Sequence, residues 1–247
     1  TWAKSVTNYV RSLGRKGKST IIGTGDRTDC AEAALANGTM SDSYDWSDEN
    51  AVCHIGSVIV PAALAVGESE NADGRQLITS VVLGYDFTAR VSEGIGLYEQ
   101  YSHGYHPTPF CGVFGAAAAS ARLLEMDEEG FTNSLGIASS YAAGLMEFLG
   151  DGSMTKRFHP GKAARDGITA SLLADAGLTG PKHVFEGDNG FIKAYSTTGD
   201  PARLTSELGK RFWITKTAVK YHSCCAANLA PIEAVLEIVR EHSVKPC

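Results

Sequence analysis

Three polar segments of the sequence concentrate side chains that can transfer protons. They cover residues 43–54, 103–108 and 152–162, and each directly precedes a strongly apolar or small-residue stretch. Their ionisable residues are Asp45, Asp48, Glu49, His54, His103, His106, Lys156, Arg157, His159 and Lys162. Loops on a rigid scaffold commonly carry catalytic groups. Carboxylates, imidazoles and ammonium groups together are the inventory for moving protons beside an anionic substrate.

Each segment taken alone has a simpler interpretation. The acidic residues 45–49 are equally typical of a solvated loop, and Lys156 with Arg157 of an ordinary basic surface. His159 precedes Pro160 and could simply cap a turn. The functional hypothesis therefore depends on the three segments being brought together.

Metal or cofactor binding is not predicted. His103 and His106 are spaced like a ligand pair, but such a pair off a helix is a weak metal signal. The six cysteines form no CxxC pair, and we interpret Cys224 and Cys225 as packing residues. The thiols are expected to be reduced and the protein cytoplasmic. The cysteines are Cys30, Cys53, Cys111, Cys224, Cys225 and Cys247.

Composition excludes several classes of protein. The formal net charge of −6 argues against a nucleic-acid partner, although a few cations in a cleft can still bind a small anion. No apolar run reaches the ~20 residues of a membrane-spanning helix, and no signal segment is visible. The sequence has neither a nucleophile-elbow Ser between a strand and a helix nor a phosphate-binding P-loop. Serine hydrolysis and phosphoryl transfer are therefore not supported.

Hydrophobic periodicity predicts a mainly α protein. Asp29 is expected to cap a helix that Gly38 ends, and Gly177 to follow the helix that starts at Pro160. The small-residue stretch 109–125 should form a central, buried helix. Residues 21–25 and 211–221 are expected to be extended, and no βαβ rhythm is present. The expected helices cover residues 30–37, 57–68, 73–95, 109–125, 127–148, 160–176, 185–195, 201–208 and 230–242.

At these segments the sequence resembles the MmgE/PrpD superfamily, whose members include 2-methylcitrate dehydratase, cis-aconitate decarboxylase and iminodisuccinate epimerase. The order and spacing of many short matches, between about residues 33 and 234, carry the resemblance. The matching stretches include residues 34–38, 45–48, 61–65, 84–86, 105–108, 112–119, 156–159, 180–181 and 220–224.

The resemblance implies an all-helical domain followed by a smaller α/β lid domain. The lid usually begins soon after the stretch that matches residues 220–224, so residues 1–247 are expected to be the helical domain, with the lid missing or truncated. The resemblance also implies a homodimer, a small di- or tricarboxylate as substrate, and no cofactor.

Position by position, the resemblance implies a pocket with catalytic and substrate-binding residues. Three departures leave the substrate open: Glu49 and Asn50 follow Asp48, Ile55 and Gly56 follow His54, and Cys225 stands where decarboxylase members carry His. The implied catalytic residues are Asp45, His54, His106, Lys156 and Lys220, and the implied substrate-binding residues are Glu49, Arg157, His159, Tyr221 and Cys225.

The leading hypothesis is a cofactor-independent lyase resembling 2-methylcitrate dehydratase. Cations would hold the substrate carboxylates and the charge that develops on proton removal. Dehydration, decarboxylation and epimerisation all suit this inventory, so cis-aconitate decarboxylase-like and iminodisuccinate epimerase-like activities are alternatives. A non-catalytic helical domain for dimerisation or partner binding is the hypothesis from a different class.

Overall fold

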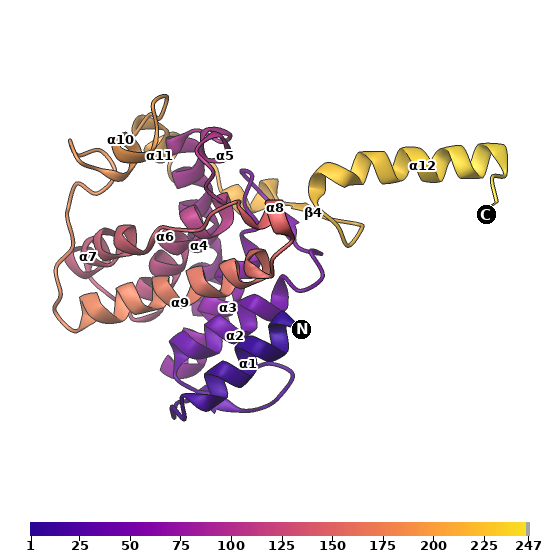
Figure 1. Cartoon of the computed structure of the whole chain (residues 1–247). Helices are drawn as coiled ribbons and strands as arrows, with labels where there is room; N and C mark the ends of the chain where they lie inside the picture. The colour runs from indigo at the N-terminus through magenta and orange to yellow at the C-terminus, as the bar shows by residue number, and fades with distance from the viewer. Residues whose placement is uncertain (246–247) are drawn as a thin grey trace.

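The computed structural model describes residues 1–245, which form a bundle of helices with two very short antiparallel strand pairs (Figure 1). The mainly α fold predicted from the sequence is confirmed. The elements are α1 (Trp2–Ser12), β1 (Ser19–Thr20), β2 (Arg27–Thr28), α2 (Cys30–Ser41), β3 (Asp48–Glu49), α3 (Gly56–Glu70), α4 (Gly74–Ile95), α5 (Glu99–Ser102), α6 (Pro107–Leu123), α7 (Glu128–Ala138), η1 (Ser139–Tyr141), α8 (Phe148–Asp151), α9 (Thr155–Asp175), α10 (Phe191–Tyr195), α11 (Ala202–Thr205), η2 (Trp213–Lys216), β4 (Ala218–Val219), η3 (Ala226–Asn228) and α12 (Leu229–His242).

The small-residue helix α6 lies at the centre of the bundle, as its composition predicts. It packs mainly against α9 and α4, and nearly all of its side chains are buried. A Cβ atom on Gly115 would lie 2.5 Å from the Gly84 carbonyl oxygen of α4, and one on Gly167 of α9 would lie 2.7 Å from the Val113 carbonyl oxygen of α6. The glycines therefore allow the three backbones to approach one another, and α6 holds its neighbours at fixed separations.

Aspartates cap three of the helices, and the cap predicted at Asp29 is confirmed. The Asp29 side chain accepts a hydrogen bond from the Glu32 amide, Asp73 forms a capping box with Gln76, and Asp127 caps α7. The prediction that Gly38 ends the first of these helices is wrong, because α2 continues to Ser41. Gly38 instead faces α9, where a Cβ would lie 2.6 Å from the Gly161 Cα.

The helix predicted over residues 127–148 is also wrong, because α7 ends at Ala138. The chain then crosses to the segment around residue 105: the His106 amide donates to the Gly144 carbonyl at 2.9 Å, and the Met146 amide to the Gly104 carbonyl at 2.8 Å. Gly144 has φ 135°, a conformation that a helix cannot contain. These backbone bonds fix the second polar segment against the connection between α7 and α9.

Helix α9 begins earlier than its sequence suggests. Pro160 was expected at its start, but α9 begins at Thr155 and carries Pro160 inside it. An interior proline removes one helical hydrogen bond, so packing of α9 on α2 and α6 must outweigh that loss. The third polar segment is therefore mostly the first turns of a helix, and Lys156, Arg157 and His159 are held rigidly.

The extended segment predicted over residues 21–25 is wrong, because these residues form the turn between β1 and β2.

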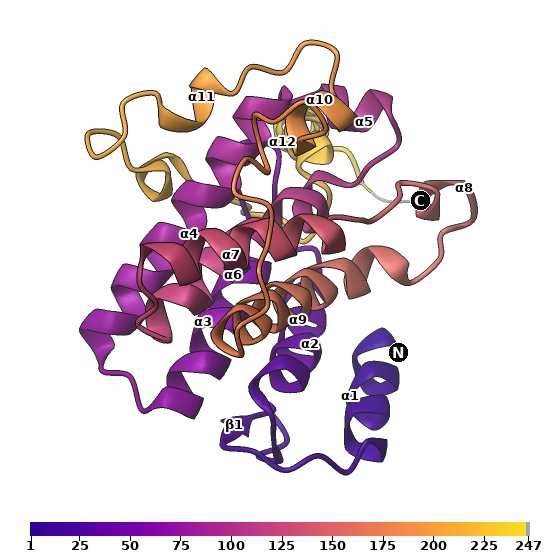
Figure 2. The ribbon, with the colours of Figure 1, turned by 90° about the vertical axis from the view of Figure 1, so that its left-hand side faces the viewer.

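The carboxyl-terminal third is less regular than predicted. In the extended segment expected over residues 211–221, only Ala218–Val219 is a strand, and it follows the 3₁₀ turn η2. The helices expected over residues 185–195 and 201–208 shrink to α10 and α11. The amphipathic helix α12 is confirmed, and it extends away from the bundle (Figure 1), so that Figure 2 shows it nearly end-on.

One strand pair brings distant parts of the chain together. Strand β4 pairs with β3, with Asp48 opposite Val219 and Glu49 opposite Ala218. Lys220 follows β4 directly, so this pairing places it beside the first polar segment. Within residues 1–245, no helix combines the length and apolarity needed to cross a bilayer.

Candidate active site

The carboxylate of Asp45 joins two lysines that are far apart in the sequence. Lys156 Nζ lies 2.7 Å from Asp45 Oδ2, and Lys220 Nζ lies 2.8 Å from Oδ1 and 3.0 Å from the Asp45 carbonyl oxygen. Burial alone raises the pKa of Asp45, but hydrogen bonds and charges from both lysines outweigh it and hold the pKa well below its usual range. Asp45 is therefore ionised and binds both ammonium groups.

Backbone geometry presents these groups to one another. Asp45 has φ 53°, a left-handed conformation that Asp tolerates better than most residues. The Trp46 indole donates to the Lys220 carbonyl at 2.6 Å and so anchors the lysine's backbone to the loop. Lys156 lies in the first turn of α9, the positive end of that helix. An anion is therefore favoured at this position.

Arg157 adds a third positive charge. Its Nη1 lies 3.5 Å from Asp45 Oδ2 and donates to the Asp42 carbonyl oxygen at 3.2 Å. Lys156 and Arg157 also line a cavity of about 300 Å³, together with Trp2, Phe148, Leu149 and Met154. The cavity gives a small anion access to the two cations. Four larger cavities, of about 490, 450, 370 and 370 Å³, are lined by none of the predicted catalytic or substrate-binding residues, although Asp48 lines the first of them.

His54 is a neutral imidazole with a defined tautomer. Its Nδ1 lies 3.1 Å from the Asp48 carbonyl oxygen, which can only accept, so Nδ1 carries the proton. Burial, together with the charge of Lys220, lowers the pKa of His54 to about 4. The hydrogen bond of the His54 ring within residues 1–245 is made by Nδ1, which leaves Nε2 to accept a proton.

His106 and His159 form a buried imidazole pair. Their Nδ1 atoms are 2.9 Å apart, and Phe148 lies edge-on to both rings. Only one proton fits between two nitrogens at this distance, so one ring donates from Nδ1 and the neutral partner carries its proton on Nε2. Burial lowers the pKa of His159 to about 4, and burial with the neighbouring His159 lowers the pKa of His106 well below its usual value. The pair therefore holds one proton-donating and one proton-accepting Nε2.

All five predicted catalytic residues are gathered in one region. Asp45, Lys156 and Lys220 are in direct contact, and the charges of Lys156 and Asp45 act on both His54 and His106. Arg157 and His159, predicted to bind substrate, also belong to this cluster through Asp45 and His106.

The other predicted binding residues are placed less centrally. Glu49 is half-buried in β3, whereas Tyr221 and Cys225 are exposed. The Tyr221 ring contacts His222 rather than the cluster. The interpretation of Cys225 as a packing residue is wrong, because it lies at a turn with its thiol in solvent. Cys247 lies outside the described residues.

Two supporting residues were not predicted. The Asp48 carboxylate accepts hydrogen bonds from the Tyr85 hydroxyl at 2.6 Å and from the Gly56 amide at 3.0 Å. The Asp48 carbonyl in turn holds His54, so Tyr85 fixes the His54 loop from α4. Tyr85 sits on a helix with apolar periodicity, which gives no sign of this contact. The only sequence signal for Asp48 is that it is an acidic residue six positions before His54.

Lys162 and His103 of the polar segments have structural partners instead. Lys162 Nζ lies 2.9 Å from Asp166 Oδ2 and donates to the Tyr141 carbonyl, and His103 is about half-exposed beside Glu99. In the part of the chain that the structure describes, no group of three His, Cys, Asp or Glu residues is placed to hold a metal ion.

The chain belongs to the MmgE/PrpD family: residues 1–204 match the family's N-terminal domain. Among curated proteins it is similar to the cis-aconitate decarboxylase-like protein oryM of Aspergillus oryzae, with 29% identity over 98% of this chain and 53% of that protein. It is 28% identical to the cis-aconitate decarboxylase of Aspergillus terreus and 26% identical to that of Mus musculus, covering 52% and 50% of those proteins. The chain thus spans about half the length of the curated relatives it matches.

Proposed function

We propose that this protein is a cofactor-independent lyase of small di- or tricarboxylic acids. The observation that carries the proposal is the buried cluster in which Asp45 joins Lys156 and Lys220, beside neutral histidines. Cations that are already oriented stabilise a carboxylate and the charge that develops next to it. Neutral imidazoles at pH 7 accept and donate protons without first having to lose one.

Decarboxylation of cis-aconitate is the favoured reaction, because the similar curated proteins are named cis-aconitate decarboxylases. The bond to one carboxylate breaks and releases CO₂, and its electron pair passes into the carbon framework. One proton must then be added to that framework. The ring of the His106–His159 pair that carries a proton on Nε2 supplies it, while Lys156 and Lys220 hold the remaining carboxylates.

Dehydration of a 2-methylcitrate-like acid is the second candidate. It is favoured by Cys225, which stands where decarboxylase members carry His and whose thiol is exposed. His54 Nε2 would remove the carbon-bound proton, and the histidine pair would protonate the departing hydroxyl to give water. Epimerisation of iminodisuccinate would use the same two groups on opposite faces of one carbon.

The test is turnover by the complete protein of cis-aconitate, 2-methylcitrate and iminodisuccinate, followed by proton NMR of the products. Lys156→Met should reduce turnover by at least ~100-fold, since removal of a preorganised stabilising group costs about that much. Lys182→Met is the matched control, because Lys182 is exposed and outside the cluster. If none of the acids is turned over by folded protein, the lyase proposal is wrong.

A non-catalytic binding or dimerisation domain predicts a different outcome. Such a domain would not be stabilised by tricarballylate, an unreactive tricarboxylate, whereas a lyase site would raise the melting temperature as ligand is added. We also propose a homodimer, which static light scattering would test. The cytoplasmic location and the assignment of residues 1–247 to the helical domain alone stay predictions.

A further inference from the structure

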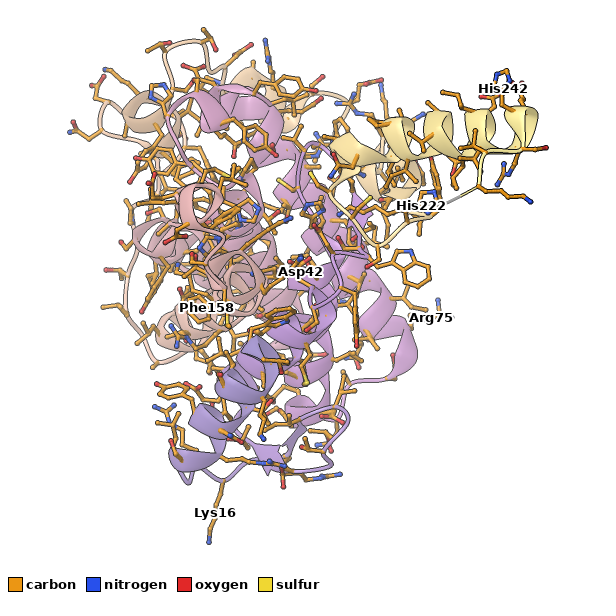
Figure 3. All side chains as sticks on the ribbon, turned by 45° about the vertical axis from the view of Figure 1, so that its right-hand side comes forward. Lys16, Asp42, Arg75, Phe158, His222 and His242 are labelled. Atoms are coloured by element: carbon orange, nitrogen blue, oxygen red, sulfur yellow. The ribbon has the colours of Figure 1, made fainter. Side chains whose placement is uncertain are left out.

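A second carboxylate, that of Asp42, is enclosed behind the Asp45 cluster. Asp42 is the residue directly after α2, and its side chain is 1% exposed. Figure 3 labels it near the middle of the view. Neither carboxylate oxygen has a hydrogen-bond partner within residues 1–245. A buried carboxylate without hydrogen bonds is costly when ionised, and the negative end of a helix adds to that cost.

Asp42 is surrounded by the charges of the candidate site. Arg157 Nη1 lies 3.7 Å from Asp42 Oδ2 and donates to the Asp42 carbonyl, and the same guanidinium contacts Asp45. Burial and the charge of Asp45 raise the pKa of Asp42 to about 6, against the lowering effect of the three cations. The charged groups that act on Asp42 are Asp45 from the loop, Arg157 and Lys156 from α9, and Lys220 after β4.

We propose that Asp42 is a positioning residue of the anion site, which acts through Arg157 and sets the net charge that a bound carboxylate meets. The proposal rests on the proposed function insofar as it takes the cluster to be a carboxylate-binding site. When Asp42 is protonated, the cluster carries two net positive charges. The three cations Lys156, Arg157 and Lys220 then face a single negative charge, that of Asp45. With Asp42 ionised, one net positive charge remains.

The protonation state of Asp42 therefore determines how strongly the site prefers a more highly charged ligand. A tricarboxylate gains more from the extra positive charge than a dicarboxylate, because the interaction energy is proportional to the ligand's charge. Ionised Asp42 also attracts the Arg157 guanidinium toward itself and away from Asp45 and the cavity. Polyanion binding is thus strongest below the pKa of Asp42.

The experiment compares the wild-type protein with Asp42→Asn, which has the shape of the protonated residue but cannot ionise. The dissociation constants of tricarballylate and glutarate are measured by calorimetry from pH 5 to 8. At each pH, the ratio between the two proteins cancels the titration of the ligand itself. Glu32→Gln is the matched control. Glu32 is also buried on α2, its pKa is raised, and one of its carboxylate oxygens has no hydrogen-bond partner among residues 1–245. Its charged neighbours are Arg15 and Arg165 instead of the cluster.

At pH 5 the wild type and Asp42→Asn should bind tricarballylate almost equally. At pH 8 Asp42→Asn should bind tricarballylate about sixfold more tightly for each ligand charge in the site. This is the effect of removing one negative charge ~8 Å away at an effective dielectric constant of ~40. The gain should be smaller for glutarate, and Glu32→Gln should follow the wild type. Asp42→Ser also removes the charge of this side chain. If it shows the same pH pattern, the effect comes from the lost charge and not from a folding defect of Asp42→Asn.

The role of Asp42 is overturned if the ratio of dissociation constants between the wild type and each Asp42 variant does not change with pH. The proposed function would then still stand. If the folded wild type and Glu32→Gln bind neither ligand at any pH, the carboxylate site itself is refuted, and the proposed function fails with it.

Discussion

The buried Asp42 carboxylate should make the folded protein less stable as pH rises, and Asp42→Asn should remove that loss. The pKa of Asp42 is raised from 3.8 to about 6 by folding. A carboxyl group with a raised folded pKa contributes stability that is fully present below the unfolded pKa and lost as pH rises through the folded value. The perturbed window is therefore pH 4 to 7.

The magnitude follows from how far folding raises this pKa. A pKa raised from 3.8 to about 6 corresponds to roughly 3 kcal/mol in the free energy of unfolding, of which roughly 1 kcal/mol is lost between pH 5 and 8. Since the side chain is 1% exposed, solvent screening removes little of this. Asp42→Asn should accordingly gain on the wild type by about that amount between pH 5 and 8.

Urea denaturation at intervals of half a pH unit measures the difference between the two proteins. Subtracting the curves removes the titration of every group that both proteins share. Asp26→Asn is the control: a hydrogen bond from Arg11 lowers the pKa of the exposed Asp26, so Asp26 is ionised throughout this range and its difference curve should be flat from pH 5 to 8. A flat difference between wild type and Asp42→Asn from pH 5 to 8 would refute the reasoning, since it would mean that Asp42 is ionised at no cost.

Further variants test the other parts of the arrangement. Lys220→Met leaves Asp45 buried with one ammonium fewer and should lower the free energy of unfolding by about 3–5 kcal/mol in urea titrations; a loss below ~1 kcal/mol would contradict a buried ion pair. Gly161→Ala places a Cβ 2.2 Å from the Leu35 carbonyl oxygen and should lower the melting temperature by several degrees, whereas Gly74→Ala, with no atom within 4 Å of its Cβ, should not. His159→Ala removes the Nδ1 partner of His106 and should slow turnover about 100-fold and shift the pH profile of the rate. His159→Asn should recover part of the rate. If the two variants have identical pH–rate profiles, a role of His159 in fixing the His106 tautomer is excluded.

Periodicity and capping were sufficient to predict the bundle but not its interruptions. The caps at Asp29, Asp73 and Asp127 depend on local hydrogen bonds, which a sequence specifies directly. The continuation of α2 through Gly38 depends on contact with Gly161, more than a hundred residues away. A glycine that permits close packing and a glycine that ends a helix look the same in one sequence.

The candidate site was predictable only in part for the same reason. The residue types in the three polar segments indicated proton transfer, and the family resemblance selected Lys220, which no local pattern marks. Asp42 was missed because the expected helix ended at residue 37, which placed Asp42 in a solvated loop. With α2 extended to Ser41, an acid directly beyond the negative end of a helix becomes an unfavourable placement, and such placements are often functional.

The cations and histidines of the cluster depend on one another. Lys156 and Lys220 help to keep His54 unprotonated, so the groups that would bind a carboxylate also preserve a base at neutral pH. A bound carboxylate offsets these charges and raises the affinity of the imidazoles for protons, because an added negative charge favours their charged form. In the proposed dehydration, an acid bound beside Lys156 would therefore strengthen His54, the base that removes its proton, and release of the product would weaken that base again. This reciprocity requires the cations and the imidazoles to share one low-dielectric region, which is what β3–β4 pairing and the early start of α9 provide.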